Sequence, residues 1–263
     1  QIQHPLLRES LLHTGIDSGL EIGAMADVPG RTGLGSSGSF TVALLAALRE
    51  HQRLPMPRQQ LAEEAFHVET VRAGQPAGKH DHYLGAFGGL TCLEIDTAGD
   101  VTVSALDISL HTLDELRNSM VVFFTGMVRE SFDILSQQEA DTAAGEPDVV
   151  DSLHQVKELG LQIRSALQEG NPDRFGELLH VHWEAKKRRS TKVSNPQIDA
   201  YYETGRRQGA LGGKLLGAGG GGFLMFYCPA EFRGQLREAM TSEGLQEMSF
   251  QFDTDGAKVL MNA

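Results

Sequence analysis

A short run of glycines and serines is the part of the sequence best suited to bind phosphate groups. Residues 33–38 read Gly-Leu-Gly-Ser-Ser-Gly. Glycine lets the backbone approach a ligand closely, and consecutive N–H groups can converge on one anion. The almost wholly apolar segment 39–51 predicts a buried helix, whose N-terminus would add a partial positive charge. The hydroxyls of Ser36, Ser37 and Ser39 could hold oxygens or a metal ion, so the run predicts a phosphate-binding loop.

This run has other interpretations. It satisfies Gly-x-Gly-x-x-Gly, but a dinucleotide-binding fold needs a second strand that ends in an acidic residue about 20 residues later. Pro55 and Pro57 follow instead, and then another helical pattern. The run is not a Walker A loop, because no Gly-Lys-Ser/Thr follows it. A tight strand-to-helix turn capped by serines is the simplest alternative.

A second glycine-rich tract spans residues 209–222 and leads directly into the apolar segment 223–227. A flexible hinge would not usually lead straight into a buried strand. We therefore expect this backbone to pack closely against another element, and the first glycine loop is a candidate.

Two acidic residues are candidates for phosphoryl-transfer chemistry, which needs oxygen ligands for a metal and a group that orients or deprotonates the attacking hydroxyl. Glu69 lies late in a helix predicted over 58–72, where a solvated acid is the simpler interpretation. Asp81 lies in a predicted loop, 78–83, next to basic side chains that would favour its ionised form. These neighbours are Lys79, His80 and His82.

The pair His80-x-His82 could also indicate a transition-metal site. We disfavour this, because no further His or Cys lies at ligand spacing. The other notable charged feature is the basic run 186–189, Lys-Lys-Arg-Arg, with Lys192 close behind it. It is either the solvated end of a helix, where cations suit the dipole, or a clamp for a substrate phosphate.

The elements that must position these residues form a mixed α and β pattern. The predicted helices are 5–14, 39–51, 58–72, 131–144, 149–169, 174–189, 197–208 and 233–243. The predicted strands are 20–26, 90–96, 101–106, 120–124, 223–227 and 248–252. Residues 73–89 are predicted to be irregular. Strand patterns are denser before about residue 116 and helix patterns are denser after it, which predicts domains at 1–115 and 116–263.

Composition narrows the class of protein. The 263 residues carry a formal charge of −12, from 23 Lys and Arg against 35 Asp and Glu. This balance disfavours nucleic-acid binding. No window approaches 18 uninterrupted apolar residues, so we expect no membrane span. The chain opens without a secretion-signal pattern, and Cys92 and Cys228 lie far apart in apolar runs. We expect two buried thiols in a reducing cytoplasm.

Two motifs resemble those of a known family. The stretch from Pro29 to Ser39, Pro-Gly-Arg-Thr-Gly-Leu-Gly-Ser-Ser-Gly-Ser, is similar to the second motif of the GHMP kinases, which wraps the ATP phosphates. Residues 214–222, Lys-Leu-Leu-Gly-Ala-Gly-Gly-Gly-Gly, are similar to the third motif, which packs beside that loop. The first motif, with the opening strands of the fold, is expected to be absent from this sequence.

Other stretches resemble one branch of the family, the D-glycero-D-manno-heptose 7-phosphate kinases. These stretches are Gly78-Lys-His-Asp-His-Tyr83 with Ala86-Phe-Gly-Gly89, Phe124-Thr-Gly126, His182-Trp-Glu-Ala-Lys-Lys187 with Ser194-Asn-Pro196, and Gly212-Gly-Lys214. The branch usually carries glutamines where His80 and His82 flank Asp81 here.

The resemblance implies a two-domain α+β fold. Its N-terminal part would be a ribosomal protein S5 domain 2-like domain that binds ATP, here lacking its first strands. Its C-terminal part would be ferredoxin-like, with the active site in the cleft between the two.

The resemblance also implies site residues. ATP would contact Pro29, Gly33, Leu34, Gly35, Ser36, Ser37, Gly38, Ser39, Gly219 and Gly220. Mg²⁺ would be held by Ser36, Ser37 and Glu69. Asp81 would orient the acceptor hydroxyl or take its proton, and Lys79 would offset developing charge. The substrate would contact His80, His82, Tyr83, Lys187 and Arg188.

The function implied is transfer of the γ-phosphoryl group of ATP to a sugar hydroxyl, the anomeric hydroxyl of D-glycero-D-manno-heptose 7-phosphate in this branch. The partners would be ATP and a sugar phosphate, without nucleic acid or membrane, and a homodimer is left open. The alternatives are a kinase for another sugar or small alcohol, and a nucleotide-binding relative without catalysis.

Overall fold

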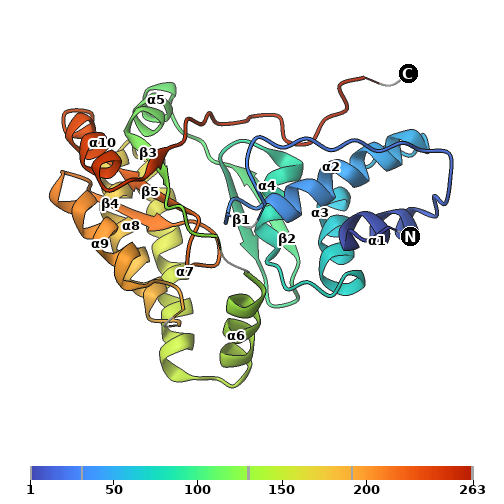
Figure 1. Ribbon diagram of the computed structural model, residues 1–263, viewed down its shortest axis with the longest axis horizontal. Helices are drawn as coiled ribbons and strands as arrows, with labels where there is room; N and C mark the ends of the chain where they lie inside the picture. Colours follow the sequence, from blue (N-terminus) through green and yellow to red (C-terminus); the bar gives the residue numbers. More distant parts are fainter. Residues whose placement is uncertain (1, 31, 129–130, 191, 262–263) are drawn as a thin grey trace. The chain divides into compact units, whose positions relative to one another are not determined.

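The computed structural model describes residues 2–30, 32–128, 131–190 and 192–261 (Figure 1). The chain divides into two compact units. The first comprises residues 1–30, 35–105 and 252–263, and the second comprises residues 31–34 and 106–251. The predicted phosphate loop therefore passes from one unit to the other between Leu34 and Gly35.

The first unit is mainly helical, with one antiparallel hairpin formed by β1 and β2. Helices α2, α3 and α4 pack against one another, and α1 packs against α2. A π-helical turn, η1, continues α3. The elements in chain order are α1 (Pro5–Thr14), α2 (Ser36–His51), α3 (Arg58–His67), η1 (Val68–Arg72), α4 (Lys79–Phe87), β1 (Thr91–Ile95) and β2 (Val101–Ala105).

The core of this unit lies among these helices and the hairpin. Small side chains on α3 and α4 let the helices approach closely, while the large apolar residues of α2 fill the space between them. The buried cluster comprises Val42, Leu45, Leu61, Ala62, Ala65, Val68, Tyr83, Ala86 and Val101. The prediction that the segment after the glycine loop is a buried helix is confirmed.

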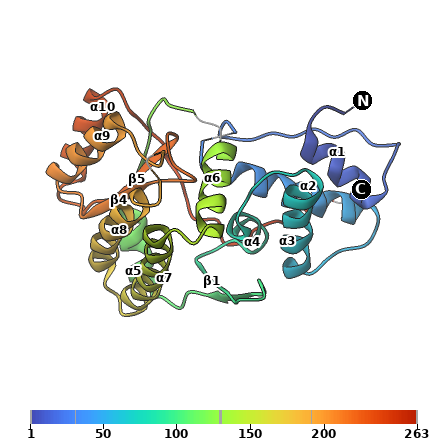
Figure 2. The same cartoon turned by 90° about the horizontal axis from the view of Figure 1, so that it is seen from below.

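The second unit combines a four-stranded sheet with six helices among its described residues. Helices α7 and α8 run side by side, and α8 packs on β4 (Figures 1 and 2). The elements are α5 (Leu110–Ser119), β3 (Met120–Phe124), α6 (Ser131–Ala143), α7 (Pro147–Gln168), α8 (Pro172–Lys187), α9 (Pro196–Arg207), β4 (Gly212–Leu215), β5 (Phe223–Tyr227), α10 (Arg233–Ser242) and β6 (Gln246–Glu247).

The sheet of the second unit has the ferredoxin-like arrangement implied by the resemblance. Its strand order is β4-β5-β3-β6, and each neighbouring pair is antiparallel. Helices connect β3 to β4 and β5 to β6, which gives the β-α-β-β-α-β sequence of that motif. The central strands β3 and β5 are almost wholly apolar and buried, as expected for strands covered by packed helices.

Two helices of the second unit begin at Asn-Pro pairs. The side chain of Asn195 accepts hydrogen bonds from the N–H groups of Gln197 and Ile198, and Pro196 takes the first helical position of α9. Asn171 and Pro172 begin α8 in the same way. Proline suits this position, because its missing N–H is not needed there and its φ is already helical. Helix α8 therefore begins two residues before its predicted start.

Several predicted elements are wrong. Residues 20–26 form no strand and are exposed, because apolar alternation does not make a strand without a pairing partner. Residues 79–87, predicted to be irregular, form α4. The glycine tract 209–222 includes a strand, β4, and all four strands of the larger sheet lie after residue 116, against the predicted distribution of strands. The predicted helix 58–72 becomes π-helical after His67.

The predicted last strand, 248–252, is also wrong. The β6 pairing ends at Glu247, with one further bond from the Met248 N–H to the Val122 carbonyl. The chain after residue 251 belongs to the first unit instead, where the Gly89 N–H donates to the Asp253 carbonyl. Arg58 also donates to the Asp255 carbonyl. Backbone groups of this segment thus bond to α4 and its surroundings and do not extend the sheet.

No disulfide bond joins Cys92 and Cys228. Cys228 is buried, as expected, and burial raises the pKa of its thiol to about 11. Cys92 on β1 is only partly buried. Among the described residues, no helix is both long enough and apolar enough to cross a membrane.

Candidate functional site

The N-terminus of α2 presents backbone amides that could bind an anion. Gly35 occupies the N-cap position with φ +68°, and among the described residues no side chain caps this end. The first intrahelical hydrogen bond runs from the Ser39 N–H to the Gly35 carbonyl, at 3.0 Å. The N–H groups of Ser36, Ser37 and Gly38 therefore have no acceptor within the helix. This is the geometry expected of a phosphate-binding loop.

Asp81 lies directly against this helix start. A Cβ on Gly35 would lie 2.8 Å from Asp81 Oδ1, and a Cβ on Gly38 would lie 2.9 Å from Asp81 Cβ. The two glycines therefore leave the space that the Asp81 side chain fills. Asp81 is in the first turn of α4 and not in a loop, so the dipole of its own helix favours its negative charge. The exposed His80 ring lies 3.2 Å from Asp81 Oδ1.

Glu69 forms a buried pair with His82, the residue that follows Asp81 in the sequence. Glu69 Oε2 lies 2.7 Å from His82 Nε2, and the side chains are 3% and 0% exposed. The rings of Phe66 and His82 pack edge to face, with their centroids 5.5 Å apart. Glu69 lies in the π-helical turn η1, an irregularity that is frequent at functional sites. A fully buried His82 can hold the Glu69 carboxylate, but it has no exposed surface to offer a substrate.

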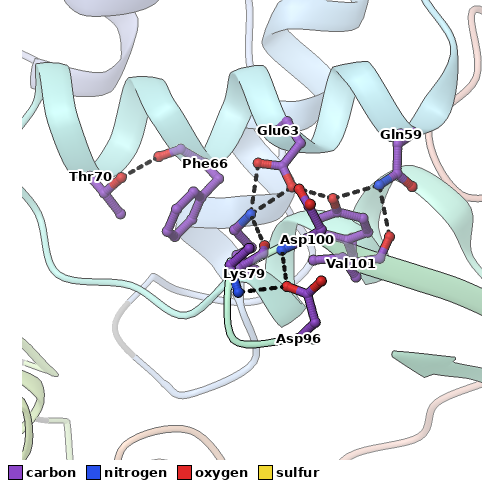
Figure 3. Close-up of polar contacts among 11 residues, drawn as sticks. Gln59, Glu63, Phe66, Thr70, Lys79, Asp96, Asp100 and Val101 are labelled. Atoms are coloured by element: carbon purple, nitrogen blue, oxygen red, sulfur yellow. Dashed lines mark hydrogen bonds and ion pairs between the residues drawn. The ribbon is translucent and has the colours of Figure 1, made fainter. Parts of the chain in front are cut away.

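Lys79 pairs with Glu63 (Figure 3). Its Nζ lies 2.7 and 3.0 Å from the two carboxylate oxygens of Glu63 and 2.7 Å from the Gly99 carbonyl oxygen. The Tyr83 hydroxyl also donates to Glu63, and Gln59 donates to Tyr83 at 2.9 Å. Lys79 therefore joins α4 to α3 and to the β1–β2 hairpin.

The pKa values in this network reflect the pairing. Burial acts to raise the pKa of Glu63, but the hydrogen bonds from Lys79 and Tyr83 outweigh it and hold the pKa below its usual value. Burial raises the pKa of Tyr83, and its bond to Glu63 raises it further. Tyr83 thus remains a neutral donor, with its ring buried in the core.

The second glycine tract packs against the first part of the loop, as predicted. A Cβ on Gly33 would lie 2.6 Å from the Leu216 carbonyl oxygen. A Cβ on Gly217 would lie 2.4 Å from Gly33 Cα, and one on Gly222 would lie 2.1 Å from the Thr32 carbonyl oxygen. Gly33 and Gly217 both have positive φ, +83° and +69°. Only glycines allow two backbones this near one another in these conformations. Leu34, partly buried, follows this contact.

Two further predicted ATP-contacting residues have backbone partners. Gly219 lies against Val193, where a Cβ would come within 2.7 Å of its carbonyl oxygen. The Gly220 N–H donates to the same carbonyl at 2.9 Å, so this amide is already engaged. Pro29 is exposed and belongs to the first unit, like residues 35–39.

The basic run at the end of α8 divides into outward and inward members. Lys187 pairs with Glu184 at 2.8 Å and with Asp199 at 3.7 Å, and exposed Arg188 donates to Gln155. These are the two residues named from the sequence as substrate contacts. Lys186 is buried instead, with its Nζ 3.2 Å from the Leu215 carbonyl oxygen. Arg189 lies in the turn just after α8, and its Nε is also buried.

Sequence reasoning missed several members of these clusters. Glu63 carried no signal beyond its helical position, although its spacing of three from Phe66 places both on one face of α3. Lys186 and Arg189 stood out only as part of a charge run. On a helical wheel of α8, Lys186 falls among the buried Leu178, Leu179 and Trp183, which would have marked it as an inward cation.

The oxygen donors implied for Mg²⁺ fit that ion chemically. The hydroxyls of Ser36 and Ser37 and a carboxylate oxygen of Glu69 are hard ligands, and His82 engages only Oε2 of Glu69. No group of three His, Cys, Asp or Glu in the described ranges could enclose a metal. These residues would thus hold Mg²⁺ together with substrate phosphates, which is its usual mode of binding.

Comparison with known families matches both parts of the chain. The family model for the GHMP kinases N terminal domain matches residues 5–89, and that for the GHMP kinases C terminal matches residues 163–245. The first match contains the start of α2, Glu69 and Asp81, and the second contains the end of α8 and the glycine tract.

Individual proteins that are similar to this chain are also sugar or sugar-phosphate kinases. D-glycero-alpha-D-manno-heptose 7-phosphate kinase of Campylobacter jejuni is 29% identical over 233 residues, covering 89% of this chain and 68% of that enzyme. Galactokinase of Thermococcus kodakarensis is 30% identical, covering 78% of this chain and 65% of its own length. The crystal structure of a D-glycero-D-manno-heptose 1-phosphate kinase from Bacteroides thetaiotaomicron superposes with a TM-score of 0.73 at 25% identity, covering 97% of this chain and 74% of that one.

The chain thus spans about two thirds to three quarters of the length of these relatives. The two family models match in chain order, and the ferredoxin-like sheet and the glycine loop at the start of α2 agree with them. The chain therefore belongs to the GHMP kinase family of phosphotransferases.

Proposed function

We propose that this chain transfers the γ-phosphoryl group of ATP to a hydroxyl of a phosphorylated sugar. The observation that carries the proposal is the position of Asp81 against Gly35 and Gly38 at the start of α2. A carboxylate that can orient a hydroxyl lies beside amides that can hold a phosphate. The identity of 29% to a heptose 7-phosphate kinase supports the anomeric hydroxyl of D-glycero-D-manno-heptose 7-phosphate as acceptor.

The amides and hydroxyls of residues 33–39 would cradle the triphosphate. The free N–H groups at the start of α2 point their partial positive charge at the bound oxygens, so negative charge that develops during transfer is stabilised without reorganisation. Pro29, Gly219 and Gly220 would shape the nucleotide contacts around this loop.

Asp81 would accept a hydrogen bond from the acceptor hydroxyl and take its proton as the hydroxyl oxygen bonds to the γ-phosphorus. The bond from the γ-phosphorus to the β,γ-bridging oxygen would break, and ADP would leave. Ser36, Ser37 and Glu69 would hold Mg²⁺, which offsets phosphate charge when bound. His82 would act through Glu69, because its buried ring holds that carboxylate. Lys79 would contribute positive charge from its pair with Glu63.

The substrate contacts in this proposal are His80, Lys187 and Arg188. His80 is the exposed member of its segment and lies 3.2 Å from Asp81 Oδ1. Lys187 and Arg188 are the outward cations at the end of α8, suited to a phosphate on the sugar. Tyr83 would support the site from the core, by fixing Glu63 and through it Lys79.

The test is an activity panel. The purified chain is incubated with ATP, Mg²⁺ and a set of sugars and sugar phosphates, and products are identified by mass spectrometry. We expect a mass increase of one phosphoryl group on a heptose 7-phosphate, with anomeric linkage by NMR. Phosphorylation of an unphosphorylated sugar or small alcohol alone would favour another member of the family. ATP binding without any product would favour the nucleotide-binding alternative.

Two further parts of the proposal concern the setting of the protein. The thiols of Cys92 and Cys228, which form no disulfide with each other, support a reducing, cytoplasmic location. A homodimer is the proposed assembly, and light scattering coupled to size-exclusion chromatography would distinguish it from a monomer.

A further inference from the structure

Four basic side chains gather where the end of α8 meets β4 in the second unit. His182, Lys186 and Arg189 come from the last turns of α8 and the residues just after it. Lys214 comes from β4, which packs on that helix. A Cβ on Gly212 would overlap the carbonyl oxygen of Gly176 in α8, so the face of β4 that carries this position packs against α8. Side chains two apart in a strand share a face, which places Lys214 on the same side.

These cations have no acidic partners within the part of the chain that the structure describes. Among those residues, no carboxylate forms an ion pair with Lys186, Arg189 or Lys214, although their neighbour Lys187 has two. Lys186 donates to the carbonyl oxygens of Leu215 and Gly217, at 3.2 and 2.5 Å. In the same described ranges, His182 Nδ1 and Arg189 Nε are buried without a hydrogen-bond partner.

Such a cluster is costly unless an anion offsets its charge. Burial lowers the pKa of Lys186 to about 7 and that of Lys214 to about 8, and repulsion between the cations adds to the effect. Burial and the same cations lower the pKa of His182 to about 3. In a chain of net charge −12, acidic side chains are abundant, yet none of the described ones pairs with these cations. Unpaired buried donors of one sign indicate a missing anion.

We propose that His182, Lys186, Arg189 and Lys214 form a binding site for a phosphoryl oxyanion. Arg189 can offer a planar fork of donors, the lysines offer point charges, and His182 can donate through one ring nitrogen. Lys186 also donates to the carbonyls of Leu215 and Gly217, so the bound anion would fix the middle of the second glycine tract. The inference uses the second unit alone and does not depend on kinase activity.

The first experiment measures anion-dependent stability. Thermal unfolding of the full chain is followed in sodium phosphate and in sodium chloride of equal ionic strength. We expect phosphate to raise Tm beyond the chloride value, because a ligand that binds only the folded state stabilises it. Lys214→Gln and Arg189→Gln should weaken phosphate binding at least about tenfold, since each removes a charged donor.

Matched controls use exposed cations of the same unit. Arg174→Gln on α8 and Lys157→Gln on α7 should keep the full phosphate response. Without phosphate, Lys214→Gln should unfold at the same temperature as the parent chain or a higher one, because it removes a repelling charge. An unchanged phosphate response in both cluster variants, or no response beyond chloride in the parent chain, would overturn the proposal.

A second measurement needs no variant. Lysine acetylation of the parent chain is mapped by mass spectrometry with and without phosphate. We expect phosphate to protect Lys214 severalfold while leaving Lys157 unchanged. Equal labelling of Lys214 under both conditions contradicts an anion at this place, even if a variant should fail to fold.

The source of the phosphoryl group is assigned by repeating both measurements with ADP and with mannose 6-phosphate. Adenosine and mannose are the phosphate-free controls. Protection by ADP alone assigns the site to the nucleotide, and protection by mannose 6-phosphate alone assigns it to a phosphorylated sugar. A chain without kinase activity can still pass these tests, so the two proposals fail separately.

Discussion

The carboxylate of Asp81 occupies the space that a side chain on Gly35 would fill. A Cβ on Gly35 would lie 2.8 Å from Asp81 Oδ1, and Gly35 itself has φ +68°. The glycine is therefore required twice, by the backbone conformation and by the neighbouring acid. This relationship joins the N-terminus of α2 to the first turn of α4 within the first unit.

Gly35→Ala should displace Asp81 and disturb the start of α2. The left-handed conformation costs an alanine about 1–2 kcal/mol, before any clash with the carboxylate. We expect a lower Tm and loss of most kinase activity. Gly23→Ala is the matched control, because open space surrounds Gly23 and its φ is not positive. Equal Tm and activity in the two variants would show that Asp81 does not need this glycine.

Asp81→Asn should leave the fold intact and lower kcat on the order of 10²-fold or more, because an amide cannot accept the proton of the attacking hydroxyl. The measurement is steady-state turnover with ATP and the sugar phosphate identified by the activity panel. The exposed Asp107→Asn should turn over normally. Normal turnover in Asp81→Asn would remove the base role from the proposal.

Glu69→Gln should raise the Mg²⁺ concentration needed for half-maximal activity, on the order of tenfold, because it replaces an anionic ligand by a neutral amide. A Mg²⁺ titration at saturating ATP measures this. Glu64→Gln on α3 is the control: Glu64 is a partly buried glutamate that pairs with Arg49 and His13 and not with His82. A metal requirement that shifts equally in both variants points to a general disturbance of the helix.

The Glu63 network predicts an acid-sensitive contribution to stability. Despite burial, hydrogen bonds from Lys79 and Tyr83 hold the folded-state pKa of Glu63 below the usual 4.5. The unfolded state thus binds more protons as the pH falls below that value, and the stabilisation is lost. We expect the fall in Tm from pH 6 to pH 3 to be smaller in Glu63→Gln than in the parent chain. Parallel Tm curves for the two proteins would contradict this.

The cations at the end of α8 predict that stability also rises with pH, but in a higher pH range. Burial, with Lys214 on β4 and Arg189 after α8 as cationic neighbours, lowers the folded-state pKa of Lys186 from 10.5 to about 7. The nearby His182 ring is neutral in this pH range, because its pKa is about 3. Between about pH 7 and pH 10.5 the unfolded state binds more protons, so stability from this group rises with pH. We expect the free energy of unfolding in urea to rise from pH 7 to pH 10, and phosphate to reduce the rise. A free energy of unfolding that stays constant from pH 7 to pH 10 in chloride would contradict a lowered pKa for Lys186.

The order of the second unit's sheet was accessible from sequence only through resemblance. Apolar runs located β3 and β5, because both strands are buried on two faces. They could not locate β4, whose glycines look like a loop until α8 packs over them. Residues 248–252 have a strand-like pattern, but the segment that follows forms backbone hydrogen bonds with Gly85 and Gly89 of the first unit and does not extend the sheet.

The residue types that carry the chemistry could be read directly from the sequence. The spacing of Gly33, Gly35 and Gly38 with two serines indicated a phosphate loop, because few other needs demand that many glycines before a helix. The sequence could not state that Asp81 begins a helix, because a short segment with two histidines and several glycines nearby has weak helical propensity. Packing of α4 against α2 and α3 overrides that propensity.

Sequence alone determined the family, the glycine loops and the identity of the candidate acid, since these depend on residue type and local spacing. Tertiary structure decided which charges are paired and which are not. Lys79 is held by Glu63, sixteen residues away, and Lys186 faces Lys214 across a helix–strand contact. Such partners are distant in the chain, and burial sets the strength of their interaction, so only the folded packing fixes both.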